Sequence, residues 1–209
     1  MVHNVEFFTP IKIGAKVKVL QELIDVHDKG NGGQTFMQLD YYDAESEEEI
    51  KYATIYVELL NFGYSGFGYK SDRKNFRIYM PERTPDAVII EKVPGNTAAI
   101  YRLIGAYNPA YINPDYSKLH NFGSTKPILG GMCTYGILTR VIFKKYGNGN
   151  FDSLKKINGK FTSPVRPGDT LEISCYKESE TVVMFSAKVI QRDVVAFKGS
   201  MEFRLTAKL

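Results

Sequence analysis

The chain has 209 residues, of which 44% are apolar and 24% are charged, enough for one large domain or two small ones with a sizeable core. This composition excludes a disordered chain, and no apolar run approaches the ~20 residues that a membrane helix needs, so we expect no membrane partner. The formal net charge of +4 is mild and the basic residues form no stripe, so we also expect no nucleic acid as partner. The N-terminus shows no secretory signal.

The first third of the chain is dominated by strand patterns. Four segments show the loose alternation of apolar and polar residues that is typical of strands: 11–28, 35–42, 50–60 and 76–80. The glycine-rich segment 29–33 predicts a turn, so the first two strands form a hairpin.

A loop rich in glycine and aromatic residues follows at 62–69. Glycines permit a close backbone approach and aromatic rings supply rigid contact area, so this loop can cover a ligand. A plain turn at the edge of a sheet explains the same composition equally well.

The middle of the chain contains two helical patterns. Asn96 can cap a short helix expected at 97–104, and the longest helical pattern spans 131–146, with a glycine-rich first turn and two lysines in the last turn. Four further strands follow, which we interpret as an antiparallel meander: 157–162, 171–176, 182–190 and 194–203. The pattern predicts an α+β fold in which an antiparallel sheet wraps around one long central helix.

Between the two helical patterns, the stretch YRLIGAYNPAYINPDY at 101–116 carries the densest series of turn-forming residues in the chain. A second marked stretch, KPILGGMCTYG at 126–136, opens the long helix. Cys133 and Cys175 lie far apart and the three histidines are isolated, so neither a disulfide framework nor a metal site is predicted.

These two stretches resemble the motifs of the MaoC-like (R)-specific 2-enoyl-CoA hydratases, known as hydratase 2, which include the hydratase part of the peroxisomal multifunctional enzyme. The resemblance extends from about residue 10 to the C-terminus and includes Asp28-Lys29-Gly30 and Gly66-Phe67-Gly68. It implies a double hot-dog fold, acyl-CoA thioesters as substrates, no cofactor and a homodimer.

The resemblance also implies a reaction, the interconversion of trans-2-enoyl-CoA and (3R)-3-hydroxyacyl-CoA in peroxisomal fatty acid β-oxidation. In the family an Asp and a His activate water and deliver a proton, an Asn between them orients the water, and a backbone N–H holds the thioester oxygen. Asn108 matches that Asn, and Gly131 matches the residue that supplies the N–H. The motif match further implies these substrate-binding residues: Lys29, Tyr107, Asn108, Pro109, Ala110, Tyr111, Gly131 and Phe161.

The chain departs from the family at the two catalytic positions. Ala106 stands at the Asp position and Tyr111 at the His position, and Gly130 replaces the residue before Gly131, which is usually His. Alanine has no proton to transfer, and a phenol with a pKa near ~10 is a poor base at neutral pH. Loss of positioned acid–base catalysis typically costs roughly 100- to 10,000-fold, so impaired hydratase activity is expected.

Several roles stay open at this point. Tyr111 either donates a hydrogen bond in the site or fills the space of the missing His, Asn108 either orients water or caps a turn, and Lys29 either contacts CoA or is a solvated turn residue. We therefore leave open whether the protein is an enzyme. The alternative is a catalytically inactive protein on the same fold that binds acyl-CoA or a partner; a thioesterase has little specific support.

Two further expectations concern organisation and location. We expect a partial N-terminal hot-dog repeat at 1–90, truncated and without its long helix, and a complete C-terminal repeat at 91–209 that carries the hydratase motif. The ending Ala207-Lys208-Leu209 fits the tripeptide that the peroxisomal import receptor reads, which indicates the peroxisomal matrix.

Overall fold

The computed structural model describes residues 1–73, 76–120 and 126–205, and these form two compact units. The first unit comprises Met1–Tyr79, Asn150–Lys160 and the chain from Gly199 onward, and the second comprises Met80–Gly149 and Phe161–Lys198. Each unit is described by itself. No helix in the described ranges is long and apolar enough to cross a membrane.

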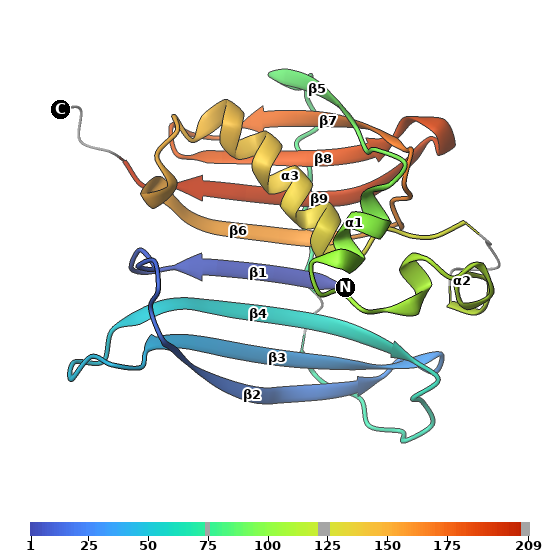
Figure 1. The fold of residues 1–209 in the computed structure, drawn as a ribbon, viewed down its shortest axis with the longest axis horizontal. Coiled ribbons are helices and arrows are strands. Elements are labelled where there is room, and N and C mark those ends of the chain that lie inside the picture. The colour runs from blue at the N-terminus through green and yellow to red at the C-terminus, as the bar shows by residue number, and fades with distance from the viewer. Residues whose placement is uncertain (74–75, 121–125, 206–209) are drawn as a thin grey trace. The chain divides into compact units, whose positions relative to one another are not determined.

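The first unit is an antiparallel sheet in the order β2-β3-β4-β1-β6 (Figure 1). Its strands are β1 (Val2–Phe7), β2 (Val17–Asp28), β3 (Gly32–Asp43), β4 (Lys51–Phe62) and β6 (Leu154–Phe161, whose last residue belongs to the second unit), and a short 3-10 helix, η2 (Phe151–Ser153), precedes β6. Val2, Phe36 and Tyr52 are almost completely buried and form part of its core. The described residues of this unit contain no long helix.

The second unit combines a sheet in the order β9-β8-β7-β5 with helices. Its elements are β5 (Ala87–Lys92), α1 (Thr97–Leu103), η1 (Pro109–Tyr111), α2 (Pro114–His120), α3 (Gly131–Tyr146), β7 (Thr170–Lys177), β8 (Val182–Val189), η3 (Ile190–Arg192) and β9 (Val194–Phe203, which continues into the first unit). Figure 1 shows α3 running across one face of β7, β8 and β9.

The long helix α3 begins and ends at the predicted residues, its sequence is amphipathic, and its last turn carries basic side chains. Tyr135, Leu138 and Ile142 recur at helical spacing and are buried, which turns this face toward the sheet. Lys144 and Lys145 lie in the last turn, where the helix dipole favours positive charge. The prediction of an antiparallel sheet with one long central helix is confirmed in this unit.

Two sequence-based expectations need correction, and three elements are added. Residues 76–80 are not a strand, and Phe76 instead hydrogen-bonds through its backbone to the side chains of Glu58 and Lys160. The last four strands are not a simple meander, because β6 pairs with β1 rather than with β7. Strands β1 and β5 and helix α2 are additional elements. The predicted strand at 76–80 does not form because the backbone groups of Phe76 bond to side chains instead of to a neighbouring strand.

Candidate functional site

The turn at Asn108 is built by its own side chain. Asn108 Oδ1 accepts the N–H of Ala110 at 3.0 Å, and its carbonyl accepts the N–H of Tyr111 at 3.2 Å. Pro109 occupies the first position of η1, where its missing N–H costs nothing. The oxygen of the Asn108 side chain is therefore used for capping, which leaves its NH2 group as the part that can bind a ligand.

Neighbouring side chains fix this turn from both sides. The buried Ser117 hydroxyl donates to the carbonyl of Ala110 at 2.9 Å, and Arg102 Nη1 donates to the carbonyl of Tyr107 at 2.8 Å. The side chain of Tyr107 is 74% exposed, so this predicted substrate-binding residue faces solvent. Ala106 is half-buried and brings no titratable atom to the site.

Tyr111 reaches the start of α3. A Cβ added at Gly130 would lie 2.7 Å from the Tyr111 hydroxyl oxygen and 2.6 Å from Cε1 of Tyr101. The two tyrosine rings lie 5.6 Å apart between centroids and are tilted by 55°. The two phenols thus occupy the space that a side chain at position 130 would need, which explains why glycine fits there.

Burial keeps this cluster neutral. It raises the pKa of the Tyr111 phenol, and the neighbouring Tyr101 and Cys133 raise it further. The pKa of Tyr101 is also raised by burial, with a smaller contribution from Cys133, and burial raises the pKa of the Cys133 thiol. At neutral pH these groups are protonated, so they can donate hydrogen bonds but cannot act as general bases.

The N-terminus of α3 offers backbone donors at the same place. The carbonyl of Gly130 accepts the N–H groups of Cys133 and Thr134 at 2.9 and 3.1 Å. The N–H groups of Gly131 and Met132 precede these and have no acceptor within the helix. Together with the positive end of the helix dipole, they form a suitable position for an oxygen that gains negative charge.

Phe161 belongs to an aromatic cluster in the second unit. Its ring centroid lies 6.3 Å from that of Tyr135 on α3 and 5.0 Å from that of Phe197 on β9. Phe161 is half-buried, so one part of its ring packs in the core and another part stays accessible. This position is compatible with the predicted contact to substrate, which stays a prediction.

Lys29 belongs to the first unit, in the turn between β2 and β3. The preceding Asp28 is 3% exposed and accepts three backbone N–H groups at 2.8 to 2.9 Å, from Gly30, Gly66 and Gly68. These bonds, that of Gly68 foremost, lower the pKa of the Asp28 carboxyl. Asp28 therefore ties the Lys29 turn to the glycine–aromatic loop. The sequence motifs around Asp28 and Gly66 are individually visible, but only the fold shows that they meet.

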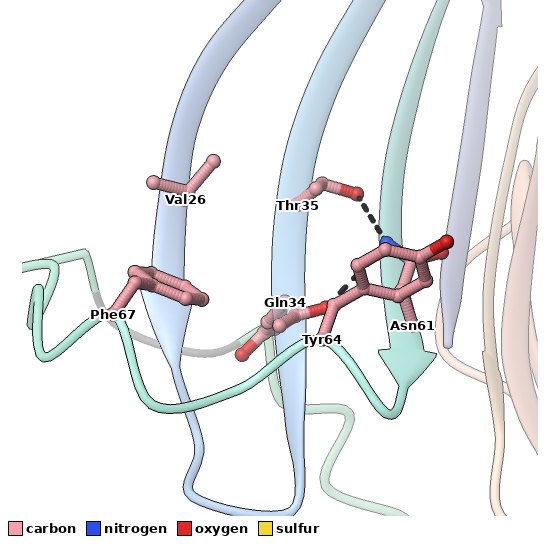
Figure 2. Close-up of a pocket in the computed structure, with 7 residues that line it drawn as sticks. Val26, Gln34, Thr35, Asn61, Tyr64 and Phe67 are labelled. Carbon is pink, nitrogen blue, oxygen red and sulfur yellow. Dashed lines mark hydrogen bonds between the residues drawn. The ribbon is translucent and has the colours of Figure 1, made fainter.

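The same loop covers a pocket of about 570 Å³ in the first unit (Figure 2). Tyr64 and Phe67 from the loop line it together with Val26 of β2, Thr35 of β3 and Asn61 of β4, and Figure 2 draws Tyr64 on the side of Asn61 and Phe67 on the side of Val26. Asn61 Nδ2 lies 3.5 Å from both the carbonyl of Gly33 and the hydroxyl of Thr35. The aromatic side chains of the loop thus line a hollow, to which the polar side chains of Gln34, Thr35 and Asn61 also contribute.

Three acidic side chains come into question as replacements for the missing Asp and His, namely Asp72, Asp86 and Asp115. Asp86 pairs with Arg83 at 2.8 Å and accepts the N–H of Lys177 at 2.7 Å, so its carboxylate already has partners within the structure. Asp115 and Asp72 are exposed. Tyr101 and Cys133 are the residues of this cluster that the sequence did not indicate, because nothing in their spacing marks them as neighbours of Tyr111.

Comparisons with known proteins agree on one family. The family model described as "MaoC like domain" matches residues 78–198. Peroxisomal multifunctional enzyme type 2 from Mus musculus is 33% identical over 186 residues, which cover 88% of this chain and 24% of that protein. The 3-hydroxyacyl-thioester dehydratase Y of Mycobacterium tuberculosis is 30% identical over 205 residues, which cover 96% of this chain and 70% of the relative.

The solved structures agree on the fold. The crystal structure of a MaoC-like dehydratase from Phytophthora capsici superposes with a TM-score of 0.85 and 28% identity, covering 99% of this chain and 71% of that one. Full-length peroxisomal multifunctional enzyme type 2 from Drosophila melanogaster gives a TM-score of 0.81, with 24% identity, 97% of this chain and 36% of that one covered. The chain spans about a quarter of the mouse relative's length.

Proposed function

The chain belongs to the MaoC-like dehydratase family, and we propose that it acts on acyl-CoA thioesters as an enoyl-CoA hydratase/dehydratase. The proposed reaction adds water across the double bond of a trans-2-enoyl-CoA, with hydroxyl at C3 and hydrogen at C2, to give the (3R)-3-hydroxyacyl-CoA. The observation that carries this proposal is the Tyr111 phenol beside the N-terminus of α3. The phenol is a hydrogen-bond donor, and the backbone N–H groups at the start of α3 are the proposed site for the thioester oxygen.

Groups at the start of α3 support the step in which the thioester oxygen gains negative charge. The thioester oxygen accepts the N–H of Gly131, and the helix dipole stabilises the negative charge that develops there as water attacks C3. The neutral Tyr111 hydroxyl donates a second hydrogen bond to this oxygen or holds the attacking water. The NH2 group of Asn108 completes the polar edge of the site.

The activation of water by a general base is poorly supported in this chain. Ala106 supplies no carboxylate, and the pKa of Tyr111 is raised rather than lowered, so no phenolate forms at neutral pH to activate water. Because positioned acid–base catalysis contributes roughly 100- to 10,000-fold, we propose slow turnover by a factor of this order.

The lack of a general base at Ala106 and Tyr111 favours a second candidate function, a protein that binds acyl-CoA without turnover. Hydration of crotonyl-CoA by the wild type and by Tyr111→Phe, followed as loss of enoyl absorbance, separates the two. Turnover that Tyr111→Phe abolishes supports the enzyme and makes Tyr111 a catalytic residue. If turnover is absent while acyl-CoA raises the melting temperature, the binding protein is correct and the hydratase proposal fails.

We further propose a peroxisomal location in fatty acid oxidation. Relatives from Mus musculus and Neurospora crassa carry the word peroxisomal in their names, and an enoyl-CoA hydratase 2 of Arabidopsis thaliana does too. Ala207-Lys208-Leu209, which we propose as the ligand of the import receptor, lies outside the described residues. A fluorescent protein fused before Met1 should enter the peroxisomal matrix, and removal of this tripeptide should leave it in the cytosol.

A homodimer is the proposed assembly. Exposed apolar side chains gather around α1, where Leu103 is 83%, Ile104 75% and Tyr107 74% accessible. Apolar surface of this kind is often covered by a partner. Light scattering on the purified chain should give twice the monomer mass, and Leu103→Lys should reduce it to the monomer value.

A further inference from the structure

Strand β2 lies at the end of the sheet of the first unit, and its outer edge pairs with no other strand in the described ranges (Figure 1). In the second unit the order β9-β8-β7 continues to β5, whereas in the first unit the order β4-β3-β2 ends at β2. An open edge of this kind presents a row of N–H and C=O groups that can pair with a further strand.

One part of this edge is closed by the chain itself. The carbonyl of Tyr69 accepts the N–H of Asp28 at 2.8 Å. The N–H of Ser71 donates to His27 Nδ1 at 2.9 Å. Covering by a loop is one of the ways in which proteins protect an edge from further pairing. The protection does not extend along the whole strand, because residues 17–23 are all exposed.

The exposed segment 17–23 is mainly apolar on both faces of the sheet. Successive side chains of a strand point to opposite faces, so Val17, Val19 and Leu23 share one face and Leu20 lies on the other. Leu20 is 49% and Leu23 59% accessible. An apolar edge strand that is open to solvent is a site where a further strand is expected to pair.

Two charged side chains of the segment lie on the same face as Leu20 and have no ion-pair partner among the residues described, namely Lys18 and Glu22. Lys16, just before the segment, differs from them because it pairs with Glu45 at 2.6 Å. Lys18 and Glu22 therefore stand equally far on either side of Leu20, with opposite charges available for a partner.

A second copy of the chain fits this segment in one register. A two-fold axis perpendicular to the sheet pairs two edges antiparallel and keeps their faces together, so it passes through one residue of β2. An axis at Leu20 uses the whole exposed segment and places Lys18 opposite Glu22 of the second copy, twice. An axis at Lys18 or Glu22 would oppose like charges, and one at Val19 or Gln21 would place Lys18 opposite an apolar residue.

We propose that β2 pairs with β2 of a second copy of this chain, antiparallel and centred on Leu20. Two pairs of Lys18 with Glu22 then flank the two leucines on one face, and Val17 packs against Leu23 twice on the other. These residues belong to the first unit, whereas α1 belongs to the second, so the contact is additional to the proposed homodimer.

The small size of the contact determines when it forms. Each copy contributes a single strand, and interfaces of small area are usually transient. The dilute sample of a light-scattering measurement therefore leaves this contact dissociated, and concentrated protein populates it.

Sedimentation equilibrium over a range of concentrations, on chains that carry Leu103→Lys to remove the α1 contact, measures this association alone. With β2 unchanged, monomer and dimer should be in reversible equilibrium. Lys18→Glu or Glu22→Lys turns two attractive pairs into two repulsive ones, so the dissociation constant should rise roughly 5- to 100-fold. Lys18→Glu combined with Glu22→Lys restores opposite charges at both positions and should recover the original affinity.

The matched control is Lys144→Glu, which makes the same change of charge on an exposed lysine of the second unit and should leave association unchanged. Hydrogen exchange then locates the contact. The amides of 17–23 that face outward should exchange several-fold more slowly in concentrated than in dilute protein, because they gain partners. The amides of β5, the strand at the other end of the sheet order, should exchange equally fast in both.

Four outcomes would overturn the proposal. A mass that stays at the monomer value at every concentration means that the copies do not pair. Single substitutions that weaken association no more than Lys144→Glu place the contact elsewhere. A double variant as weak as the single ones rules out the register centred on Leu20. If association occurs while exchange at 17–23 is independent of concentration, the copies meet at another surface and the edge is open only to a strand of a different protein.

Discussion

Substitution of Gly130 by alanine tests the contact between Tyr111 and the start of α3. The added Cβ would lie 2.6 Å from Tyr101 and 2.7 Å from the Tyr111 hydroxyl, whereas ordinary contact begins near 3.4 Å, so both rings must retreat by about 0.7 to 0.8 Å. Gly130 has φ −55° and ψ 138°, which alanine adopts without strain, so the entire cost is steric.

The expected effect on stability follows from these distances. Overpacking costs about 1–3 kcal/mol, and the loss of unfolded-state freedom on replacing glycine offsets about 0.4–1 kcal/mol of it. Gly130→Ala should therefore destabilise the fold by about 1–2 kcal/mol, a fall in melting temperature of about 2–8 °C. A displacement approaching 1 Å at a reacting group can cost roughly 100-fold in rate. The rate of crotonyl-CoA hydration by the folded Gly130→Ala variant should therefore fall by about this factor, in addition to the loss of stability.

Gly136→Ala is the matched control in the same helix. No atom lies within 4 Å of a Cβ built there, so alanine should stabilise α3 by about 0.8–1 kcal/mol without touching the site. Denaturant unfolding and crotonyl-CoA hydration are measured on both variants and on Gly130→Ala combined with Tyr111→Phe, which removes one of the two closest atoms. If Gly130→Ala is as stable as Gly136→Ala, or if Tyr111→Phe does not reduce its cost, the phenols do not occupy this space.

Three further perturbations test separate parts of the structure. Ala106→Asp combined with Tyr111→His restores the family's acid–base pair and should raise hydration of crotonyl-CoA roughly 100- to 10,000-fold over the wild type; no gain would show that the pair is not what limits turnover. The pKa of Asp28 is lowered in the fold, so its stabilisation of the loop is present above the unfolded value near ~4 and is lost as pH falls through the lower folded value. The amide resonance of Gly66 should shift in that acidic range in the wild type and should not in Asp28→Asn, and identical titrations would refute the clamp. Leu138→Ala empties a fully buried site on α3 and should cost about 2–5 kcal/mol in urea unfolding, whereas a loss below about 1 kcal/mol would mean that the helix is not anchored there.

The regular elements could be predicted from the sequence because their patterns are local. The helix at 131–146 combines apolar spacing, a glycine-rich start and terminal lysines, and the structure confirms its bounds. The strand at 76–80 fails for the opposite reason. Its alternation is genuine, but the groups that Phe76 bonds to, Glu58 and Lys160, are distant in sequence.

The candidate site could be predicted only in part. Motif resemblance identifies Asn108, Tyr111 and Gly131, but the structure alone shows that the Tyr111 phenol lies over Gly130. It also shows that Asn108 uses its oxygen for capping. The roles of these residues, and the division into repeats at 1–90 and 91–209, stay predictions.

The position of β1 has a consequence for the order of events during synthesis. This strand lies between β4 and β6, and Lys156 on β6 pairs with Glu6 on β1 across 150 positions of sequence. At about 5–20 residues per second, the ribosome needs roughly 8–30 s to make the intervening chain, and one edge of β1 must wait unpaired throughout. Contacts of such long range make folding slow, so the N-terminal strand should be among the last to gain protection in pulse-labelled refolding.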